Sequence, residues 1–404
     1  MIADSQQIER IAADARAAGR LALDTEFMGE GRYRTLLCLI QVSVPVQALD
    51  GASAQASPDP LSAGHGERID LIDPLSGELD TSPLADVLAD PQIQIVVHAG
   101  RQDVALLRRT LSTEIVNVFD TQLAAGFAGL AAQRSYESLL SQVLGVRLAK
   151  SASFTRWDRR PLTDEQISYA REDVLHLLQL AGALQQRLTE LGRLQWALQE
   201  CEPLALASDA RDLDVVFARL PRISSAAPGA QAIARELVGW RERTAERQDR
   251  PVQGVLADAA LVEVAKRKPS SASELASIRG IPQGIARRAG AEIIECVRRG
   301  QQRPTERRQP APRSQPPDPT DAPLVALAEA LARTRAAEAG FAYELIATRA
   351  DLQAIVAARR LREPEPEVRA LSGWRRELLG QEILRLLDGE ITLAVKDGKL
   401  RVEG

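Results

Sequence analysis

Two acidic residues follow an apolar run near the start of the chain, in LALDTEFMGE at residues 21–30. Asp24 and Glu26 are two positions apart, so in an extended strand both side chains point to the same face. Burying two unpaired charges together costs free energy. The pattern therefore predicts that the strand ends at the surface or that a cation lies between the carboxylates.

A third acidic residue, Asp103, lies in IQIVVHAGRQDVALL, a segment typical of a strand, a turn and a helix. Asp103 would occupy the first helical turn, where the helix dipole favours a carboxylate. That favourable position can explain Asp103 without any chemistry. His98 lies in the turn. A single histidine is more often a core or turn residue than a metal ligand.

The segment PLTDEQISYAREDVLHLL predicts a helix that begins after Thr163, because Gln166 completes a capping box. Tyr169 and Asp173 are four positions apart and share one face of this helix. Taken alone, the pair fits an ordinary amphipathic helix with a half-buried tyrosine and a solvated aspartate.

The four carboxylates together predict a metal site. Like charges that converge repel each other and take up protons unless cations compensate. Two divalent ions held roughly 3.5–4 Å apart are a known solution for phosphodiester cleavage. Asp24 is the candidate to bridge both ions, whereas Tyr169, with a reference pKa of about 10, is a poor general base and is expected to position the attacking water. The candidate metal ligands are Asp24, Glu26, Asp103 and Asp173.

The composition narrows the choice of metal and of compartment. The chain has 404 residues, with three histidines and three cysteines. So few nitrogen and sulfur ligands argue against zinc, and oxygen ligands favour Mg²⁺ or Mn²⁺. The cysteines form no close pair, which argues against a disulfide framework and is typical of a reducing cytoplasm. We find no signal peptide and no membrane-spanning run, so no membrane partner is expected.

An α/β domain with a mixed sheet must position these acids, and we place it at residues 1–210. A short connection after the second strand favours antiparallel pairing there. The turn-rich segment 51–67 predicts a loop inserted between strands. The expected strands are 20–25, 36–44, 68–72, 93–97 and 115–118, and the expected helices are 82–89, 101–110, 120–129, 135–144 and 163–190.

Strand patterns end after about residue 205, and helical patterns follow. Ile233, Leu237 and Trp240 have the spacing of one helical face. Asp397-Gly398 predicts a hairpin turn near the end of the chain. The predicted units are a helical domain at 228–300, a Pro- and Arg-rich linker at 301–322 and a second helical domain at 323–404.

Charge is divided unevenly between the two halves. Residues 1–210 hold 18 Lys+Arg and 28 Asp+Glu, whereas residues 211–404 hold 33 and 27. Metal binding suits the acidic half, and a polyanionic partner suits the basic half. The alternative is compositional drift in an Arg- and Ala-rich genome.

The order of these motifs resembles the DEDD exonucleases that carry a tyrosine in the last motif. HAGRQDVALL, FDTQLAAGFAG and RWDRRPLTDEQISYAREDVLHL are similar to the ribonuclease D family in particular. The last segment follows the family pattern W-x-x-R-P-L-T-x-x-Q-x-x-Y-A-x-x-D-V. The resemblance covers residues 5–300 well and the remainder loosely.

This resemblance implies a ribonuclease-H-like exonuclease fold and metal-dependent hydrolysis of RNA from its 3′ end, with release of nucleoside 5′-monophosphates. It also implies tRNA precursors, trimmed at their 3′ trailers, as the usual substrate. It assigns Asp24, Glu26, Asp103, Tyr169 and Asp173 to the catalytic positions, and it implies contacts with the terminal nucleotide near Thr25, Phe27 and His98.

Residues 228–300 resemble the HRDC domain of helicases and ribonuclease D, and residues 323–404 resemble a divergent second copy. The first holds 13 Lys+Arg and 9 Asp+Glu, a balance that favours contact with phosphates. Few aromatic side chains accompany these charges, so base-specific reading is not expected. Alternatively, the basic residues only solvate helix faces; these are Arg241, Arg243, Arg247 and residues 266–268.

The residues alone leave three functions open. The leading one is a 3′-5′ exoribonuclease. A DNA exonuclease on the same fold is the second, because a metal site does not distinguish sugars and recognition of the 2′-OH depends on other side chains. The third is a catalytically silent nucleic-acid-binding adaptor, in which the basic half dominates.

Overall fold

The structure, a computed structural model, describes residues 2–45, 66–77, 79–131, 133–148, 156–303 and 318–404. Its N-terminal domain is built on a five-stranded sheet in the order β3-β2-β1-β4-β5. The strands are β1 (Arg20–Met28), β2 (Leu36–Pro45), β3 (Glu67–Ile72), β4 (Gln94–Val97) and β5 (Val118–Asp120). β1 pairs antiparallel with β2 and parallel with β4, so the sheet is mixed, as predicted.

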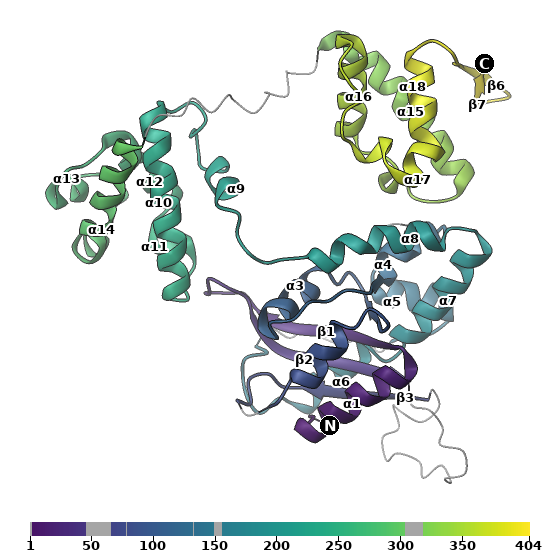
Figure 1. The fold of residues 1–404 in the computed structure, drawn as a ribbon, viewed down its shortest axis with the longest axis horizontal. Helices are drawn as coiled ribbons and strands as arrows, with labels where there is room; N and C mark the ends of the chain where they lie inside the picture. Colours follow the sequence, from purple (N-terminus) through teal and green to yellow (C-terminus); the bar gives the residue numbers. More distant parts are fainter. Residues whose placement is uncertain (1, 46–65, 78, 132, 149–155, 304–317) are drawn as a thin grey trace.

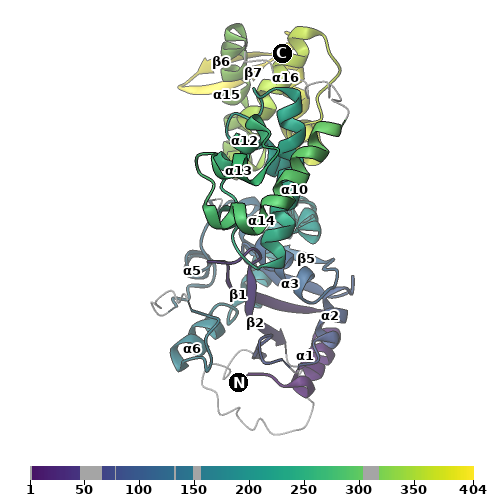
Figure 2. The same ribbon diagram turned by 90° about the vertical axis from the view of Figure 1, so that its left-hand side faces the viewer.

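Helices cover both faces of this sheet (Figures 1 and 2). They are α1 (Ser5–Ala18), α2 (Ser82–Leu88), α3 (Arg101–Thr110), α4 (Thr121–Phe127), α5 (Tyr136–Leu139) with the π-helical turn Leu140–Leu144, α6 (Asp164–Glu172), α7 (Leu177–Glu190) and α8 (Leu194–Cys201). α1, α2 and α3 pack on the face of β1 that carries Leu21 and Leu23. α4 and α7 pack on the opposite face, which carries Ala22. The first part of β1 is therefore buried on both sides.

Several elements of the N-terminal domain differ from the sequence prediction. The predicted helix 163–190 is two helices, because the backbone N–H of His176 donates to the hydroxyl of Tyr136 (3.2 Å) where a continuous helix would need it. β5 begins only at Val118, because β4 offers three residues for pairing. α1 and α8 were not predicted, although the capping box of Asp4 and Gln7 at the start of α1 was a readable signal. Most of the predicted loop 51–67 lies outside the described residues.

The second half begins with a helical lobe. It comprises α9 (Leu213–Ala218), α10 (Pro228–Arg247), α11 (Val252–Val255), α12 (Asp258–Arg267), α13 (Ala272–Ala276) and α14 (Gln283–Gln302). Ile233, Leu237 and Trp240 are buried in its core, as predicted. Arg241 does not solvate a helix face: it is 1% exposed and donates to Asp258 (2.6 Å) inside the lobe.

A second helical lobe ends the chain. It comprises the short turn Pro319–Asp321, α15 (Ala322–Ala339), α16 (Arg349–Leu361), α17 (Gly373–Arg375), α18 (Gln381–Leu387), β6 (Thr392–Lys396) and β7 (Lys399–Glu403). The predicted hairpin is present, and both residues of its turn, Asp397 and Gly398, have positive φ. Residues 304–317 of the predicted linker lie outside the described part of the chain. Across the described residues, no helix is long and apolar enough to cross a membrane.

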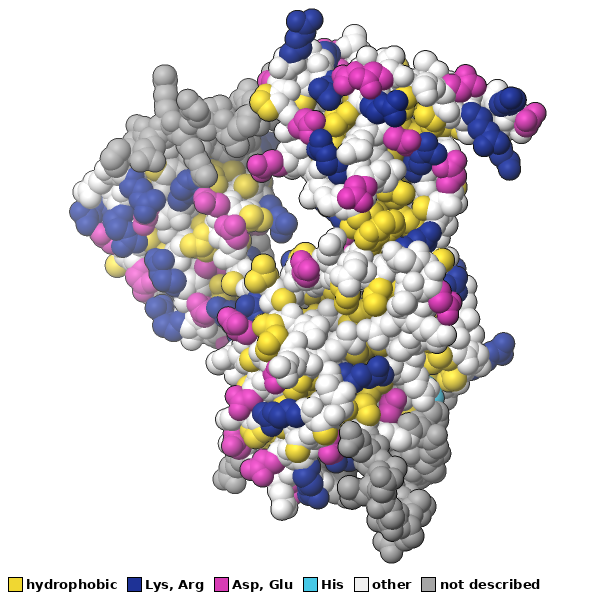
Figure 3. Space-filling model, turned by 45° about the vertical axis from the view of Figure 1, so that its right-hand side comes forward, with side chains coloured by type: hydrophobic (Ala, Val, Ile, Leu, Met, Phe, Trp, Pro, Cys, Tyr) yellow, Lys and Arg dark blue, Asp and Glu magenta, His cyan; other side chains and the backbone are white. Residues whose placement is uncertain are grey.

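The C-terminal lobe packs on the N-terminal domain through an aromatic seam. The rings of Trp196 and Trp374 stack with centroids 5.1 Å apart, and Phe127 meets Trp374 edge-on at 5.3 Å. The guanidinium of Arg193 lies 5.0 Å from the centre of the Phe341 ring. One hydrophobic cluster therefore continues across both domains, and hydrophobic side chains gather along this junction in Figure 3.

Candidate active site

β1 carries Asp24 and Glu26 on the face that bears Ala22, beyond the point where the apolar core ends. Both residues are partly exposed. The register of β1 with β2 shifts between Glu26 and Phe27. A bulge at this position increases the local twist of a strand and is frequent beside active sites. The strand end is therefore both accessible and bent where the two acids stand.

α3 brings Asp103 to the same strand end. Asp103 lies in the first helical turn, as the sequence predicted, and is 8% exposed. The hydroxyl of Thr25 donates a short hydrogen bond to Oδ1 of Asp103. This bond ties the helix to β1 from the opposite face of the strand to the one that carries Asp24.

The turn between β4 and α3 is held by Asp120, a residue that the sequence analysis did not single out. Its carboxylate accepts from the backbone N–H groups of Ala99 (3.1 Å) and Gly100 (3.0 Å), and it also caps α4 by accepting from Gln122 (2.8 Å). A Cβ at Gly100 would lie 2.5 Å from the Cβ of Val97, so the turn requires glycine there. An acidic residue directly before a predicted helix is a cap signal that the sequence shows. The sequence does not show that the same carboxylate accepts from a turn twenty residues earlier.

α6 positions Tyr169 and Asp173. The predicted capping box is confirmed: the backbone N–H of Thr163 donates to Gln166 (3.0 Å), and that of Gln166 donates to Thr163 (3.2 Å). Asp173 is the residue at which the helix ends. The ring of Tyr169 lies 6.1 Å from that of Trp157, which is buried. The capping box therefore fixes the start of α6, and the helix ends at the fourth acid, Asp173.

Arg160 anchors the segment that leads into α6. Its guanidinium donates to both carboxylate oxygens of the buried Asp73 and to the backbone carbonyl of Cys38 at 2.7 Å. It also donates to the carbonyl of Trp157 (2.7 Å). One arginine of the motif R-W-D-R-R-P-L-T therefore fixes the start of α6 against β2 and β3.

The four carboxylates act on each other electrostatically. Burial, followed by the charges of Asp103, Asp173 and Glu26, raises the pKa of Asp24 well above its ordinary value. Burial and the charges of Asp173 and Asp103 raise the pKa of Glu26 to about 8. Burial raises the pKa of Asp173 to about 7 and also raises that of Asp103. The charges of Asp103 and Asp173 therefore reach both acids of β1.

Tyr169 belongs to the same group. Burial and the charges of Asp173, Glu26 and Asp24 raise the pKa of its phenol above the ordinary value. A tyrosine with a raised pKa keeps its proton at neutral pH. The phenol can therefore orient a bound molecule by a hydrogen bond but cannot serve as a base there.

The donor set suits a hard divalent cation. All four side chains offer carboxylate oxygens, which Mg²⁺ and Mn²⁺ prefer. A cation between them would offset the burial and the neighbouring charges that raise the pKa values of Asp24 and Glu26. Among the described residues, however, no three acidic, His or Cys side chains already stand in an arrangement that would hold an ion. One oxygen of Asp103 is engaged by Thr25.

The three residues implied in nucleotide contacts occupy different surroundings. Thr25 is 5% exposed and its hydroxyl faces Asp103. Phe27 is partly exposed at the end of β1. The Nδ1 atom of His98 lies 3.0 Å from the hydroxyl of Thr121, and burial lowers its pKa. Phe27 and His98 are thus both partly exposed, whereas Thr25 is buried against Asp103.

Two protein-family models match the chain. Residues 1–189 match the family model described as a 3′-5′ exonuclease, and residues 230–297 match the HRDC domain. Ribonuclease D of Granulibacter bethesdensis is 34% identical over 403 residues, which cover 99% of this chain and 95% of that protein. This chain belongs to the ribonuclease D family. The resemblance seen in the motifs is therefore confirmed over the full length.

Two other members of the ribonuclease D family support the assignment. Ribonuclease D of Acidiphilium cryptum is 33% identical over 402 residues and is matched over 96% of its length. The crystal structure of Escherichia coli RNase D, described as an exoribonuclease involved in structured RNA processing, has a TM-score of 0.77. It is 28% identical and is matched over 98% of its chain, so the predicted fold class, an α/β domain followed by helical domains, is confirmed.

Proposed function

We propose that this chain is a metal-dependent 3′-5′ exoribonuclease that releases nucleoside 5′-monophosphates from the 3′ end of RNA. The observation that carries the proposal is the convergence of Asp24, Glu26, Asp103 and Asp173, with Tyr169 beside them. The order of these five residues in the chain is the order of the family motifs. Membership of the ribonuclease D family over the full length supports the choice of RNA as the substrate class.

We assign two divalent ions, Mg²⁺ or Mn²⁺, to the four carboxylates, with Asp24 shared between them. When bound, such ions supply a hydroxide at neutral pH and offset the charge of the leaving 3′-oxygen. Thr25 is assigned to hold Asp103 in place through its hydroxyl. Tyr169 is assigned to orient the attacking water, because its phenol keeps its proton.

We extend the proposal to the RNA substrate and to the location in the cell. We propose tRNA precursors as substrates, and the processing of structured RNA by the Escherichia coli relative is consistent with that choice. We also propose a cytoplasmic location, because Cys38, Cys201 and Cys296 are all buried as free thiols.

A substitution at the shared carboxylate tests the proposal. Asp24→Asn should abolish metal-dependent nucleotide release without lowering the thermal unfolding temperature, because the amide keeps the shape and removes a charge that burial and the neighbouring acids disfavour. Asp86→Asn, an exposed aspartate on α2, is the matched control and should keep wild-type activity. Wild-type activity that survives excess EDTA, or an active Asp24→Asn variant, would contradict the proposal.

The competing functions are separated by substrate. RNA and DNA oligonucleotides of equal sequence and length, labelled differently and mixed in one reaction, should be degraded at different rates, with RNA preferred. Equal rates would favour the DNA exonuclease. RNA binding without any nucleotide release in the presence of Mn²⁺ would favour the silent adaptor.

A further inference from the structure

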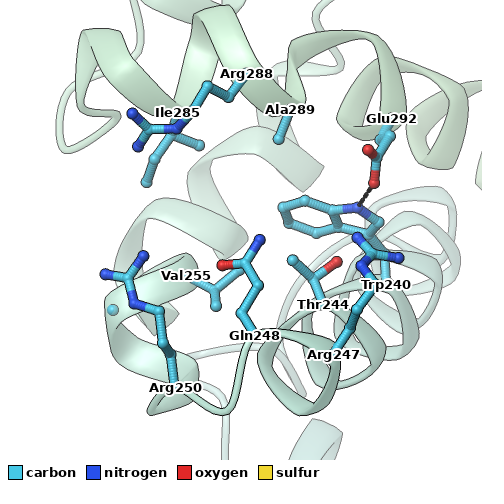
Figure 4. Close-up of a pocket in the computed structure, with 11 residues that line it drawn as sticks. Trp240, Thr244, Arg247, Gln248, Arg250, Val255, Ile285, Arg288, Ala289 and Glu292 are labelled. Carbon is cyan, nitrogen blue, oxygen red and sulfur yellow. Dashed lines mark hydrogen bonds between the residues drawn. The ribbon is translucent and has the colours of Figure 1, made fainter. Parts of the chain in front are cut away.

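Gln41, on β2, is a fully buried residue whose side chain forms no hydrogen bond. Elsewhere in the molecule a buried polar group is paired: the indole of Trp240 is 5% exposed and donates to Glu292 at 2.6 Å (Figure 4). Gln41 is 0% exposed, and within the described residues neither its amide nitrogen nor its amide oxygen has a partner. Since nearly all buried amides in proteins are hydrogen-bonded, this one calls for a partner in the working enzyme.

The register of the sheet places Gln41 beside the catalytic acids. In the antiparallel pair of β1 and β2, Gln41 lies directly opposite Asp24. Opposite residues of such a pair point to the same face of the sheet, with Cβ atoms about 4.5–5.5 Å apart. A glutamine side chain is long enough to span that separation. The amide of Gln41 can therefore reach the carboxylate of Asp24.

The other neighbours of Gln41 on this face offer the amide less. Leu71 of β3 lies opposite Gln41 on the other side of β2 and has no polar side-chain atom. Leu39 and Ser43 precede and follow Gln41 on the same face of β2. Leu39 is apolar, and the hydroxyl of Ser43 already donates to a carboxylate of β3 at 3.0 Å. Asp24 is thus the one charged group among these four neighbours.

α6 closes the space over this part of the sheet. Ala170, in α6, packs with Leu39 and Leu71 in one buried hydrophobic cluster. Asp24 is partly exposed, whereas Gln41 is sealed from water. A hydrogen bond between Gln41 and Asp24 would therefore link the dry interior of the domain to the metal site.

We propose that Gln41 is a positioning residue that holds Asp24 for metal binding, with the amide nitrogen of Gln41 donating to one carboxylate oxygen of Asp24. This inference rests on the proposed function, in which Asp24 binds the metal ions. An ionised carboxylate accepts hydrogen bonds at several lone pairs. One bond from the amide fixes the orientation of the carboxylate and leaves its other lone pairs to the ions. The same bond gives the buried amide its partner.

The test measures Mn²⁺ binding by the full chain, without turnover. Gln41→Met keeps the unbranched shape of the side chain and removes the amide. The dissociation constant for Mn²⁺, measured from the electron paramagnetic resonance signal of free Mn²⁺, should rise by about 10–100-fold, as is typical when a partner of a metal ligand is lost. The unfolding temperature without metal should not fall, because no unpaired amide remains buried. A residue with only a structural role would lower the unfolding temperature and leave the dissociation constant unchanged.

Ser43→Ala is the matched control. Ser43 is also 0% exposed and lies on the same face of the same strand, but it stands opposite Ala22 rather than an acid. Its loss should leave the dissociation constant for Mn²⁺ at the wild-type value.

A double variant shows whether the effect passes through Asp24. Added to Asp24→Asn, Gln41→Met should raise the dissociation constant no further, because the carboxylate that the amide supports is already gone. A wild-type dissociation constant for Gln41→Met, or an equal rise in both backgrounds, would overturn the proposal. A chain that binds Mn²⁺ but releases no nucleotide would refute the proposed function and leave this test valid.

The wild-type chain provides a second measurement that needs no variant. In a crystal grown with Mn²⁺, the amide nitrogen of Gln41 should lie about 2.7–3.2 Å from an oxygen of Asp24, the range of a hydrogen bond. An amide that remains unpaired beside the bound ions, or that bonds only to other groups, would also overturn the proposal.

Discussion

Thr25 stands between the two acids of β1 and faces the other way. Neighbouring side chains of a strand point to opposite faces, so the hydroxyl of Thr25 points away from the face of Asp24 and Glu26. It donates to Asp103. The types and spacing of the four acids and Tyr169 could be read from the sequence. The partner of Thr25 could not, because a contact between residues 78 positions apart depends on how α3 packs.

A change at Thr25 separates positioning from direct catalysis. Thr25→Val removes the donor to Asp103 and should raise the Mn²⁺ concentration needed for half-maximal activity by about tenfold, the size typical of residues that orient a metal ligand. Titration of activity with Mn²⁺ measures this, and Thr25→Ser should restore the wild-type value. A Thr25→Val enzyme that titrates like the wild type would show that the bond does not support the site.

Glu67, on β3, should make stability depend on pH. Burial raises its pKa from 4.5 to about 7, although the hydroxyl of Ser43 donates to it (3.0 Å). Because the folded pKa is the higher one, the protonated group favours the folded state below pH 4.5, and this contribution is lost as the pH rises through about 7. Glu67→Gln should therefore raise the free energy of unfolding above that pH and flatten its decline. Urea unfolding at acidic and alkaline pH checks this; parallel curves for the two proteins would contradict it.

The turn before α3 is the element on which the site depends most. Asp120 holds the backbone of Ala99 and Gly100 and also caps α4. The sequence predicted α3 with its bounds, because apolar spacing and the turn residues are local signals. It did not predict the break between α6 and α7, because the hydrogen bond from His176 to Tyr136 that replaces a helical bond comes from tertiary packing.

Loss of this turn should harm stability and activity together. Asp120→Ala removes several hydrogen bonds to buried or partly buried backbone N–H groups and should cost about 2–3 kcal/mol, with a large loss of nucleotide release. Asp212→Ala removes the N-cap of α9 in the helical lobe and should cost about 1 kcal/mol, with activity kept. Thermal unfolding and turnover of both variants are measured. Equal loss of activity in the two would show that the turn has no special role.

The C-terminal lobe is fastened to the catalytic domain in the whole molecule. The stacked and edge-on rings of Trp196, Phe127 and Trp374 join their cores. The helical character and the final hairpin were predictable from the sequence. The seam was not, because single aromatic residues far apart in the chain carry no signal of their pairing. A fragment that ends near residue 210 would expose the rings of this seam to water. The inactivity of such a fragment would therefore not show that the protein is a catalytically silent adaptor.

Trp374 tests this coupling. Trp374→Ala should destabilise the protein by about 3–5 kcal/mol, as expected for a buried tryptophan, and should lower the unfolding temperature of the catalytic domain as well. Val395→Ala, in the hairpin of the same lobe and 77% exposed, should leave both unchanged. Calorimetry resolves the transitions. A catalytic-domain transition that Trp374→Ala does not shift would show that the two domains unfold independently.

The most direct test of the catalytic assignment is a crystal of the full chain soaked in Mn²⁺ and recorded at a wavelength where manganese scatters anomalously. We predict two peaks at the end of β1, with Asp24 in contact with both and Glu26, Asp103 and Asp173 completing the ligands. Peaks elsewhere, or a strand end without manganese and with Asp103 and Asp173 turned away from Asp24, would contradict the account.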